Sequence, residues 1–176
     1  MSLRQKIMRL ACSDDVGRFF ALRNNIVNCP NRSLRRLMKP VWRIRYQKLC
    51  VKYGAGIPLS ANIGKSTTFP HSLYGIFVSM GATIGEGCVI FHQVTIGSNT
   101  LANSRKYGAP TIGNNVYIGA GAKIIGNVKI GNNVRIGANA VVVQDVPDNA
   151  TVVLTSPRVI IHEESRDNSF HSFHKS

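Results

Sequence analysis

Two histidines, His71 and His92, are the residues of this chain whose setting points most directly to chemistry. His71 lies in "FPHSLYGIFVS", two residues after Phe69, and His92 lies in "VIFHQVTIGS", two residues after Ile90. A neutral imidazole, whose ordinary pKa is about 6.5, can take the proton of a hydroxyl group near neutral pH. The chemistry expected of these residues is therefore the activation of a hydroxyl as a nucleophile.

The element that must position them is a repeat, because an aliphatic or aromatic residue recurs every six positions along most of the chain. The series are Ile57, Ile63 and Phe69; Val78, Ile84, Ile90 and Ile96; and Ile112, Ile118, Ile124, Ile130, Ile136 and Val142. A helix has a period near 3.6 and a flat strand a period of two, so neither explains six. A short strand followed by a corner, stacked into a solenoid, does. The pattern predicts a mainly β fold, a parallel β-helix.

The repeat is interrupted twice. Nine residues separate Phe69 from Val78, three more than one hexapeptide, and the segment "SNTLANSRKYGAP" adds ten residues between Ile96 and Ile112. If each coil holds three hexapeptides, the first insertion places Ile90 directly above Phe69. Interruptions of a packed array cost stability, so they are expected where a site lies.

The same count places four residues in one column. His71 and His92 follow their anchors by two residues, so they occupy one corner on adjacent coils, roughly 4.8 Å apart along the stack. Ala120 and Ala138 continue this corner on the next two coils. The prediction is a histidine corner, formed by His71 and His92 and extended by the two alanines.

The segment "IGNNVYIGAGAKIIGNVKIGNNVRIGANAVV" resembles the hexapeptide-repeat acyltransferases. Within that superfamily, residues 54–160 are similar to the serine acetyltransferases, through the two histidine segments quoted above. The resemblance implies that the β-helix is left-handed and that acetyl-CoA is the acyl donor. It also implies that His71 is the catalytic histidine, with His92 beside it as a second catalytic candidate that orients His71, contacts substrate or is simply exposed.

The resemblance implies a cofactor site as well. Small residues at Ala120 and Ala138 would let the CoA arm approach the backbone, and Arg158 matches a basic residue that contacts CoA in related transferases. Gln144 stands where several relatives have Lys, and it is assigned to the same site. Backbone N–H groups at a corner are expected to stabilise the oxyanion.

The acceptor is predicted from where the chain departs from its relatives. Serine acetyltransferases hold the amino acid with acidic residues, at positions that fall near Gly56 and Pro70 here, and neither residue can bind an ammonium group. A neutral hydroxyl on a sugar or surface-polysaccharide intermediate is therefore the expected acceptor, because the carboxylates that select a charged amine are missing. Serine is the alternative acceptor.

Two other classes of protein, a non-catalytic scaffold and a zinc enzyme, fit the sequence less well. A non-catalytic β-helix scaffold would need neither a histidine corner nor a long loop. A γ-class carbonic anhydrase shares the fold but needs three histidines around zinc, and the solenoid holds only His71 and His92. No metal is therefore expected.

Residues 1–53 hold thirteen Lys and Arg against two Asp, whereas the rest of the chain holds nine against six. This segment is predicted to be a basic α-helical cap on the end of the solenoid. Apolar residues recur in it at helical spacing: Leu34, Leu37, Met38, Val41 and Leu49. Attraction to an anionic membrane surface is a second interpretation of the charge. No nucleic-acid motif accompanies the charge, so no nucleic-acid partner is expected.

Three further expectations concern the whole molecule. The family arrangement predicts a homotrimer with CoA between neighbouring solenoids, and the loop 98–110 is predicted to project, cover the histidine corner and reach an adjacent subunit. Scattered cysteines and the lack of a signal peptide predict a cytoplasmic location, at the inner membrane surface if the basic segment contacts lipid. Residues 161–176 lose the repeat and are expected to form a disordered polar tail.

Overall fold

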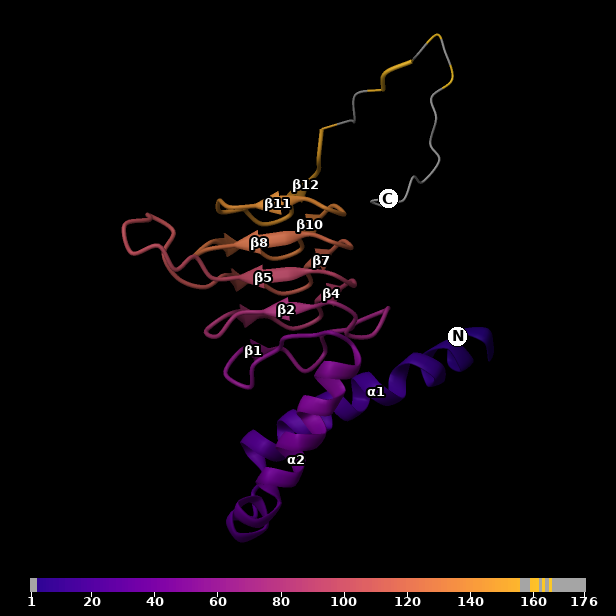
Figure 1. Ribbon diagram of the computed structural model, residues 1–176, viewed down its shortest axis with the longest axis vertical. Helices are drawn as coiled ribbons and strands as arrows, with labels where there is room; N and C mark the ends of the chain where they lie inside the picture. The colour runs from indigo at the N-terminus through magenta and orange to yellow at the C-terminus, as the bar shows by residue number, and fades with distance from the viewer. Residues whose placement is uncertain (1–2, 156–158, 162, 164, 166–176) are drawn as a thin grey trace, which may run out of the picture.

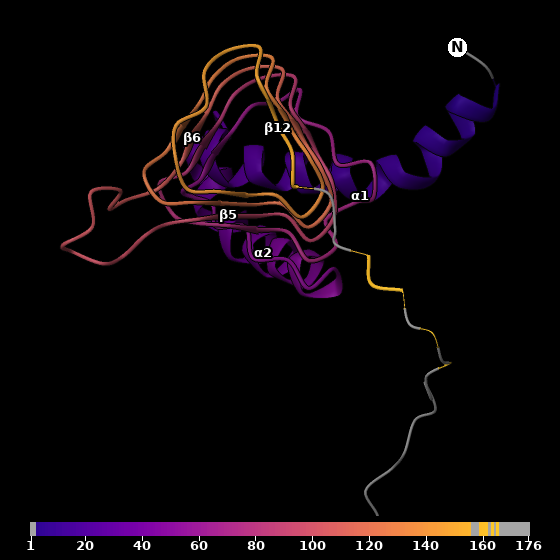
Figure 2. The ribbon, with the colours of Figure 1, turned by 90° about the horizontal axis from the view of Figure 1, so that it is seen from above.

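The computed structural model consists of two helices followed by a three-sided solenoid (Figures 1 and 2). It describes the backbone of residues 3–155, 159–161, 163 and 165, and side chains from Asp15 onward. Helix α1 spans Leu3–Asn28 and helix α2 spans Arg32–Lys52. The tail predicted for residues 161–176 lies largely outside the described residues and stays a prediction.

The described strands form three parallel four-stranded sheets. The first contains β1 (Asn62–Ile63), β3 (Thr83–Ile84), β6 (Thr111–Ile112) and β9 (Lys129–Ile130). The second contains β4 (Val89–Ile90), β7 (Tyr117–Ile118), β10 (Arg135–Ile136) and β12 (Thr151–Val152). The third contains β2 (Phe77–Val78), β5 (Thr95–Gly97), β8 (Lys123–Ile125) and β11 (Val141–Val142). Strands adjacent in each sheet come from successive coils, so the predicted parallel β-helix is confirmed.

The register of the coils is the predicted one. A parallel bridge joins Thr68 to Val89, which places Phe69 beneath Ile90, and Ile90 pairs with Ile118 in the next coil. These anchors point inward and are almost completely buried. At the end of the solenoid the coil is shorter, because Arg135 pairs with Thr151, sixteen residues later rather than eighteen. The six-residue period therefore shortens after β11.

Corners of the solenoid are tight because adjacent coils approach at backbone level. A Cβ atom added to Gly85 would lie 2.5 Å from the carbonyl oxygen of Gly113, closer than real Cβ contacts allow. Asn115 and Asn133 adopt positive φ at another corner, where their side chains form a hydrogen bond of 2.8 Å. Gly and Asn thus provide the turns, because they tolerate close approach or left-handed backbone.

The helices lie under the first coil. Phe19 of α1 and Tyr46 and Cys50 of α2 are buried, and the Tyr46 hydroxyl donates to the carbonyl oxygen of Ile57. Arg23 donates to the carbonyl oxygens of Pro58 and Ala61 in the same coil. These contacts join the helix pair to the base of the solenoid.

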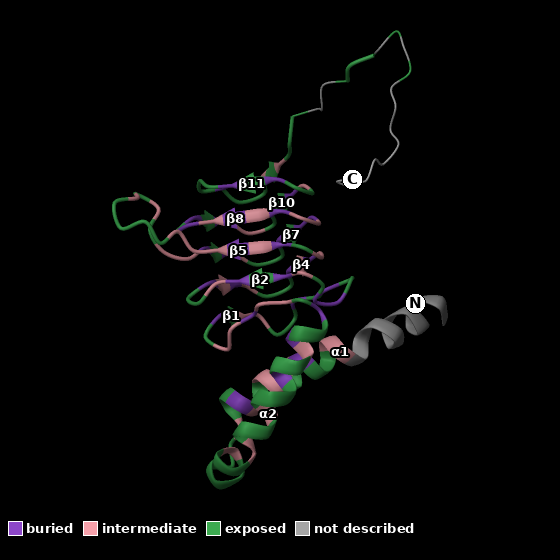
Figure 3. Cartoon of the chain, in the orientation of Figure 1, coloured by how far each residue is buried: buried purple, intermediate pink, exposed green. Residues whose placement is uncertain are grey.

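The apolar face expected on α2 is only partly used for this packing. Leu34, Leu37 and Val41 remain exposed, by 46%, 75% and 40%, and the fully buried residues of the helix are Tyr46 and Cys50. The helix also continues through Pro40. Met38 and Leu49 of the same set are half-buried, so helical spacing alone does not specify which face of α2, most of which is exposed, meets the solenoid (Figure 3).

Two glycine substitutions should have opposite effects on stability. Gly85→Ala should lower the free energy of unfolding by about 1–3 kcal/mol, because the new methyl group meets the backbone of the next coil. Gly17→Ala should raise it by about 1 kcal/mol, because that helical position has open space and Ala is the better helix former. Urea unfolding at one fixed protein concentration measures both. Equal effects would contradict the close coil packing.

Candidate functional site

The predicted meeting of His71 and His92 is confirmed. Their Nδ1 atoms lie 2.8 Å apart and their ring centroids 4.8 Å apart. His92 lies at the corner between β4 and β5, and His71 lies at the same corner of the coil below, before β2. His71 is exposed and His92 is half-buried. Two imidazoles, far apart in sequence, thus form one hydrogen-bonded pair at the surface of the solenoid.

Unusual backbone conformations hold the pair. Ser72, which follows His71, has φ 56°, and Gln93, which follows His92, has φ 59°. The other described non-glycine residues with positive φ are all asparagines: Asn115, Asn133, Asn139 and Asn149. Residues other than Gly and Asn adopt this conformation at a cost that the surrounding structure must offset, and such costs concentrate at sites. The Ser72 hydroxyl is buried without a hydrogen-bond partner, as is the hydroxyl of Ser79 after β2.

The three-residue insertion after Phe69 does more than present His71. Leu73 and Ile76 are fully buried, so part of the insertion enters the core. Tyr74 lies outside, where its ring packs edge-on against Tyr53 with centroids 4.7 Å apart. The inserted segment beside His71 is therefore anchored from within the core and also packs on the outside.

The short contact between the histidines limits where protons can lie. A hydrogen bond between two Nδ1 atoms requires one to carry hydrogen and the other a lone pair. The ring that donates through Nδ1 keeps its lone pair on Nε2, which then can accept a proton from a hydroxyl. Either ring can be the donor, and where His71 donates, the free Nε2 lone pair belongs to the more exposed of the two rings.

Aromatic rings and a lysine surround the pair. Phe91 packs edge-on against His71 with centroids 5.3 Å apart, and Tyr117 lies beside Phe91. The ammonium group of Lys123 donates to the carbonyl oxygens of Gln93, at 3.0 Å, and Gly121, at 2.8 Å. Sequence reasoning missed Lys123, because it occupies an ordinary outward position of the repeat and only the coil stacking brings it to the corner.

The corner amides are engaged with neighbouring coils. The N–H of Gln93 donates to Tyr74, that of Gly121 to His92 and that of Asn139 to Ala120. These three N–H groups are therefore not available to an oxyanion, contrary to the general expectation that corner amides would supply that donor.

The predicted cofactor residues divide between two corners. The hydrogen bonds just described place Ala120 and Ala138 above His92, half-buried and exposed respectively, as predicted. Gln144 follows β11 and is exposed, so it lies at the corner between the third and first sheets instead. Arg158 lies outside the described residues. Their roles toward CoA stay predictions.

The loop 98–110 projects from the solenoid, as predicted (Figure 2). It leaves between β5 and β6, whereas the histidine corner lies between β4 and β5, so within one chain it does not cover that corner. An antiparallel bridge between Asn99 and Gly108 closes its base, and Lys106 forms an ion pair with Asp145 at 2.7 Å. That it reaches an adjacent subunit stays a prediction.

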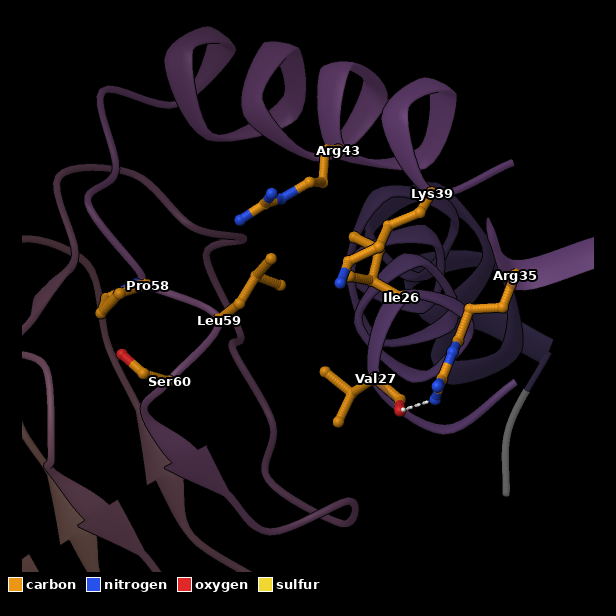
Figure 4. Close-up of a pocket in the computed structure, with 8 residues that line it drawn as sticks. All are labelled: Ile26, Val27, Arg35, Lys39, Arg43, Pro58, Leu59 and Ser60. Atoms are coloured by element: carbon orange, nitrogen blue, oxygen red, sulfur yellow. Dashed lines mark hydrogen bonds between the residues drawn. The ribbon is translucent and has the colours of Figure 1, made fainter. Parts of the chain in front are cut away.

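A hollow in the molecule lies away from the histidines. It is lined by α1, α2 and residues 58–60, with Arg35, Lys39 and Arg43 around it (Figure 4). Within the part of the chain that the structure describes, no group of three His, Cys, Asp or Glu side chains is placed to hold a metal ion.

Comparison with known proteins gives the family of the repeat. Residues 109–144 match the family described as bacterial transferase hexapeptide (six repeats). The chain contains a hexapeptide-repeat transferase domain. Solved serine acetyltransferases share this fold, so the solenoid is a left-handed β-helix, as the resemblance implied.

The hexapeptide-repeat transferase domain is similar to serine acetyltransferases. One from Synechococcus elongatus is 41% identical over 107 residues, which are 61% of this chain and 43% of the relative. One from Staphylococcus epidermidis is 42% identical over 113 residues, 64% of this chain and 51% of the relative. The structure of a soybean serine acetyltransferase complexed with serine has a TM-score of 0.61 at 30% identity, covering 83% of this chain and 56% of that one. The chain spans about half the length of the curated relatives it matches.

The proton arrangement of the pair can be measured by ¹⁵N NMR of the imidazoles. In the wild type we expect His71 to be mainly the Nδ1–H tautomer, since His92 accepts that hydrogen. His92→Asn should preserve this state, because the amide oxygen can take the place of Nδ1, and His92→Ala should shift His71 toward the commoner Nε2–H tautomer. The same tautomer in all three proteins would contradict the assignment.

Proposed function

We propose that this chain is an acetyl-CoA-dependent O-acetyltransferase in which His71 is the general base. The observation that carries the proposal is the His71–His92 contact at a corner of a hexapeptide-repeat transferase domain. Similarity to serine acetyltransferases supports acetyl-CoA as the donor. His92 is the positioning residue, because it holds the Nδ1–H of His71 and so leaves Nε2 basic.

The reaction follows from this arrangement. Nε2 of His71 takes the proton of the acceptor hydroxyl as its oxygen attacks the thioester carbonyl carbon. The tetrahedral intermediate then breaks its carbon–sulfur bond, and the protonated His71 returns the proton to the departing sulfur of CoA. The products are an acetyl ester and free CoA, and the pair regains its starting protonation.

Serine is the acceptor that the similar proteins favour. The relatives are named serine acetyltransferases, and one solved relative is described as complexed with serine. This supports the alternative acceptor of the sequence analysis better than the sugar hydroxyl that we expected first. Serine is therefore the first acceptor to test.

A sugar hydroxyl remains a second candidate because of the surroundings of Gly56. A side chain at that position would begin 2.6 Å from the ring of Phe77, so the ring occupies the space where an acidic side chain would extend. Pro70 likewise offers no carboxylate beside His71. Phe77 is half-exposed, and aromatic faces suit the apolar face of a sugar ring.

Four of the five described carboxylates support the same point, since their contacts lie elsewhere. Asp15 binds Lys52 and Tyr53, Glu86 binds Ser66, Asp145 binds Lys106 and Asp148 binds Asn132. Within the described residues, these four are therefore committed to structural contacts rather than to an ammonium group at the histidine corner.

The test is release of CoA from acetyl-CoA with serine and with a panel of sugars. His71→Ala should lower kcat roughly 10²–10⁴-fold with the best acceptor, the usual contribution of a general base. The melting temperature should change little, because the ring is exposed. His92→Asn should retain more activity than His92→Ala. Full activity of His71→Ala would refute the proposal, and the acceptor that gives the higher kcat/KM decides between serine and sugar.

We also propose that the active unit is a homotrimer in which the loop 98–110 completes a neighbour's site. Light scattering at micromolar concentration should give three times the 19.3 kDa mass of one chain. Asn99 and Gly108 are bridged, so residues 100–107 can be replaced by a two-residue turn. The shortened variant should still assemble from three chains, but its activity should be lower. A monodisperse monomer, or full activity of the shortened variant, would contradict this.

A further inference from the structure

Helix α2 carries an exposed apolar stripe that its packing leaves unused. The stripe consists of Leu34, Leu37, Val41, Ile44 and Val51, which are 46%, 75%, 40%, 56% and 74% exposed. Successive members are three, four, three and seven residues apart, so they share one face of the helix. This face lies away from the buried Tyr46 and Cys50, which contact the rest of the chain. Five large apolar side chains on one helix face form a patch, not scattered exposure.

The same helix is strongly cationic. Its 21 residues include eight Lys and Arg and neither Asp nor Glu. Lys48 lies within the stripe, and Arg45 and Lys52 lie along one edge of it. Among the described residues, Lys52 is the one cation of α2 in an ion pair, with Asp15 at 2.6 Å. The hydrogen bonds from Lys52 and Tyr53 lower the pKa of Asp15, which therefore stays charged and committed to this contact.

Further cations of α2 point into the hollow at its base (Figure 4). Arg43 extends toward Leu59 and Lys39 toward Ile26, and Arg35 donates to the carbonyl oxygen of Val27 at 3.1 Å. Arg43 also lines a hollow with Tyr46 and Cys50, so these cations lie on the side of α2 that faces the first coil. Arg45 and Lys48 lie beside the stripe instead, and a partner of that face must offer both an apolar medium for the stripe and negative charge for these two groups.

A second copy of α2 meets only the first requirement. Pairing two stripes would bring Arg45 and Lys48 of one helix close to those of the other and would bury Lys48 beside another Lys48, with no acid on either helix to compensate. Nucleic acid meets only the second requirement, because a phosphate backbone offers nothing for five apolar side chains. An anionic lipid surface meets both, since the stripe enters the acyl boundary while Lys and Arg bind headgroups.

We propose that α2 lies flat on an anionic membrane surface and holds the solenoid there by its base. The helices sit at one end of the prism, beyond β1, so the coils stand away from the lipid (Figures 1 and 3). Neither described helix is apolar enough along its length to cross a bilayer, so the contact is in the plane of the membrane. This inference goes beyond the proposed acyl transfer and does not depend on it.

The test is cosedimentation of the full chain with phosphatidylcholine vesicles, with and without phosphatidylglycerol. Binding should require the anionic lipid and weaken as salt is raised. Leu37→Gln/Ile44→Gln should lower the partition coefficient at least tenfold, and Arg45→Gln/Lys48→Gln should lower it by a similar factor on anionic vesicles. The matched control is Met80→Gln/Leu101→Gln, which removes apolar groups that are 73% and 66% exposed elsewhere, and it should bind like the wild type.

Three results would overturn the proposal. One is equal binding to neutral and anionic vesicles, and another is loss of affinity in the charge variant but not in the stripe variant. The third is a smaller assembly of Leu37→Gln/Ile44→Gln in lipid-free light scattering, which would show that the stripe is covered by another copy. Circular dichroism of each variant checks that α2 is still helical, and the vesicle readout needs no acceptor substrate.

Discussion

The stacking of aliphatic side chains inside the solenoid is the constraint on which the other features depend. Each anchor lies on the anchor of the coil below, as Ile118 lies on Ile90, and hydrogen bonds between parallel strands follow that order. A slip of one residue would turn the buried row outward, so the register is strongly specified. The residues two places after each anchor are positioned as firmly as the anchors themselves. Contact between His71 and His92 is a result of core packing, although neither ring belongs to the core.

The histidine corner combines this regular frame with local departures from it. The frame sets the spacing of the rings along the stack, while Ser72 and Gln93 adopt a conformation that the other corners reserve for Asn or Gly. Leu73 and Ile76 anchor the inserted segment from within, and Lys123 binds the carbonyl oxygens on the outside. The corner is thus held from both sides, which favours a fixed orientation of the imidazoles and a defined proton between them.

Much of this could be predicted from the sequence, because a six-residue period leaves few architectures and the count of inserted residues fixes which coils meet. The pairing of Phe69 with Ile90, and hence the histidine pair, follows from that count. The identity of the buried face of α2 does not, because α2 has apolar residues on two faces and only tertiary contact selects Tyr46 and Cys50. The corner from which the long loop projects was implicit in its position after Ile96, yet its relation to the histidines was misjudged. Lys123 and the strained turns carry no periodic signal.

The two ends of the solenoid differ, and this difference governs how the molecule opens. The first coil is sealed by Phe19, Tyr46 and the hydrogen bonds of Arg23, whereas the last coil, which ends at β12 after a shortened turn, has no such cover among the residues that the structure describes. In a linear stack each coil is stabilised by its immediate neighbours, so opening begins at the less protected end and spreads coil by coil. Amide hydrogens near β11 and β12 should therefore exchange first. The histidines lie in the coils next to the sealed end, so they keep their geometry while the last coils open and close locally.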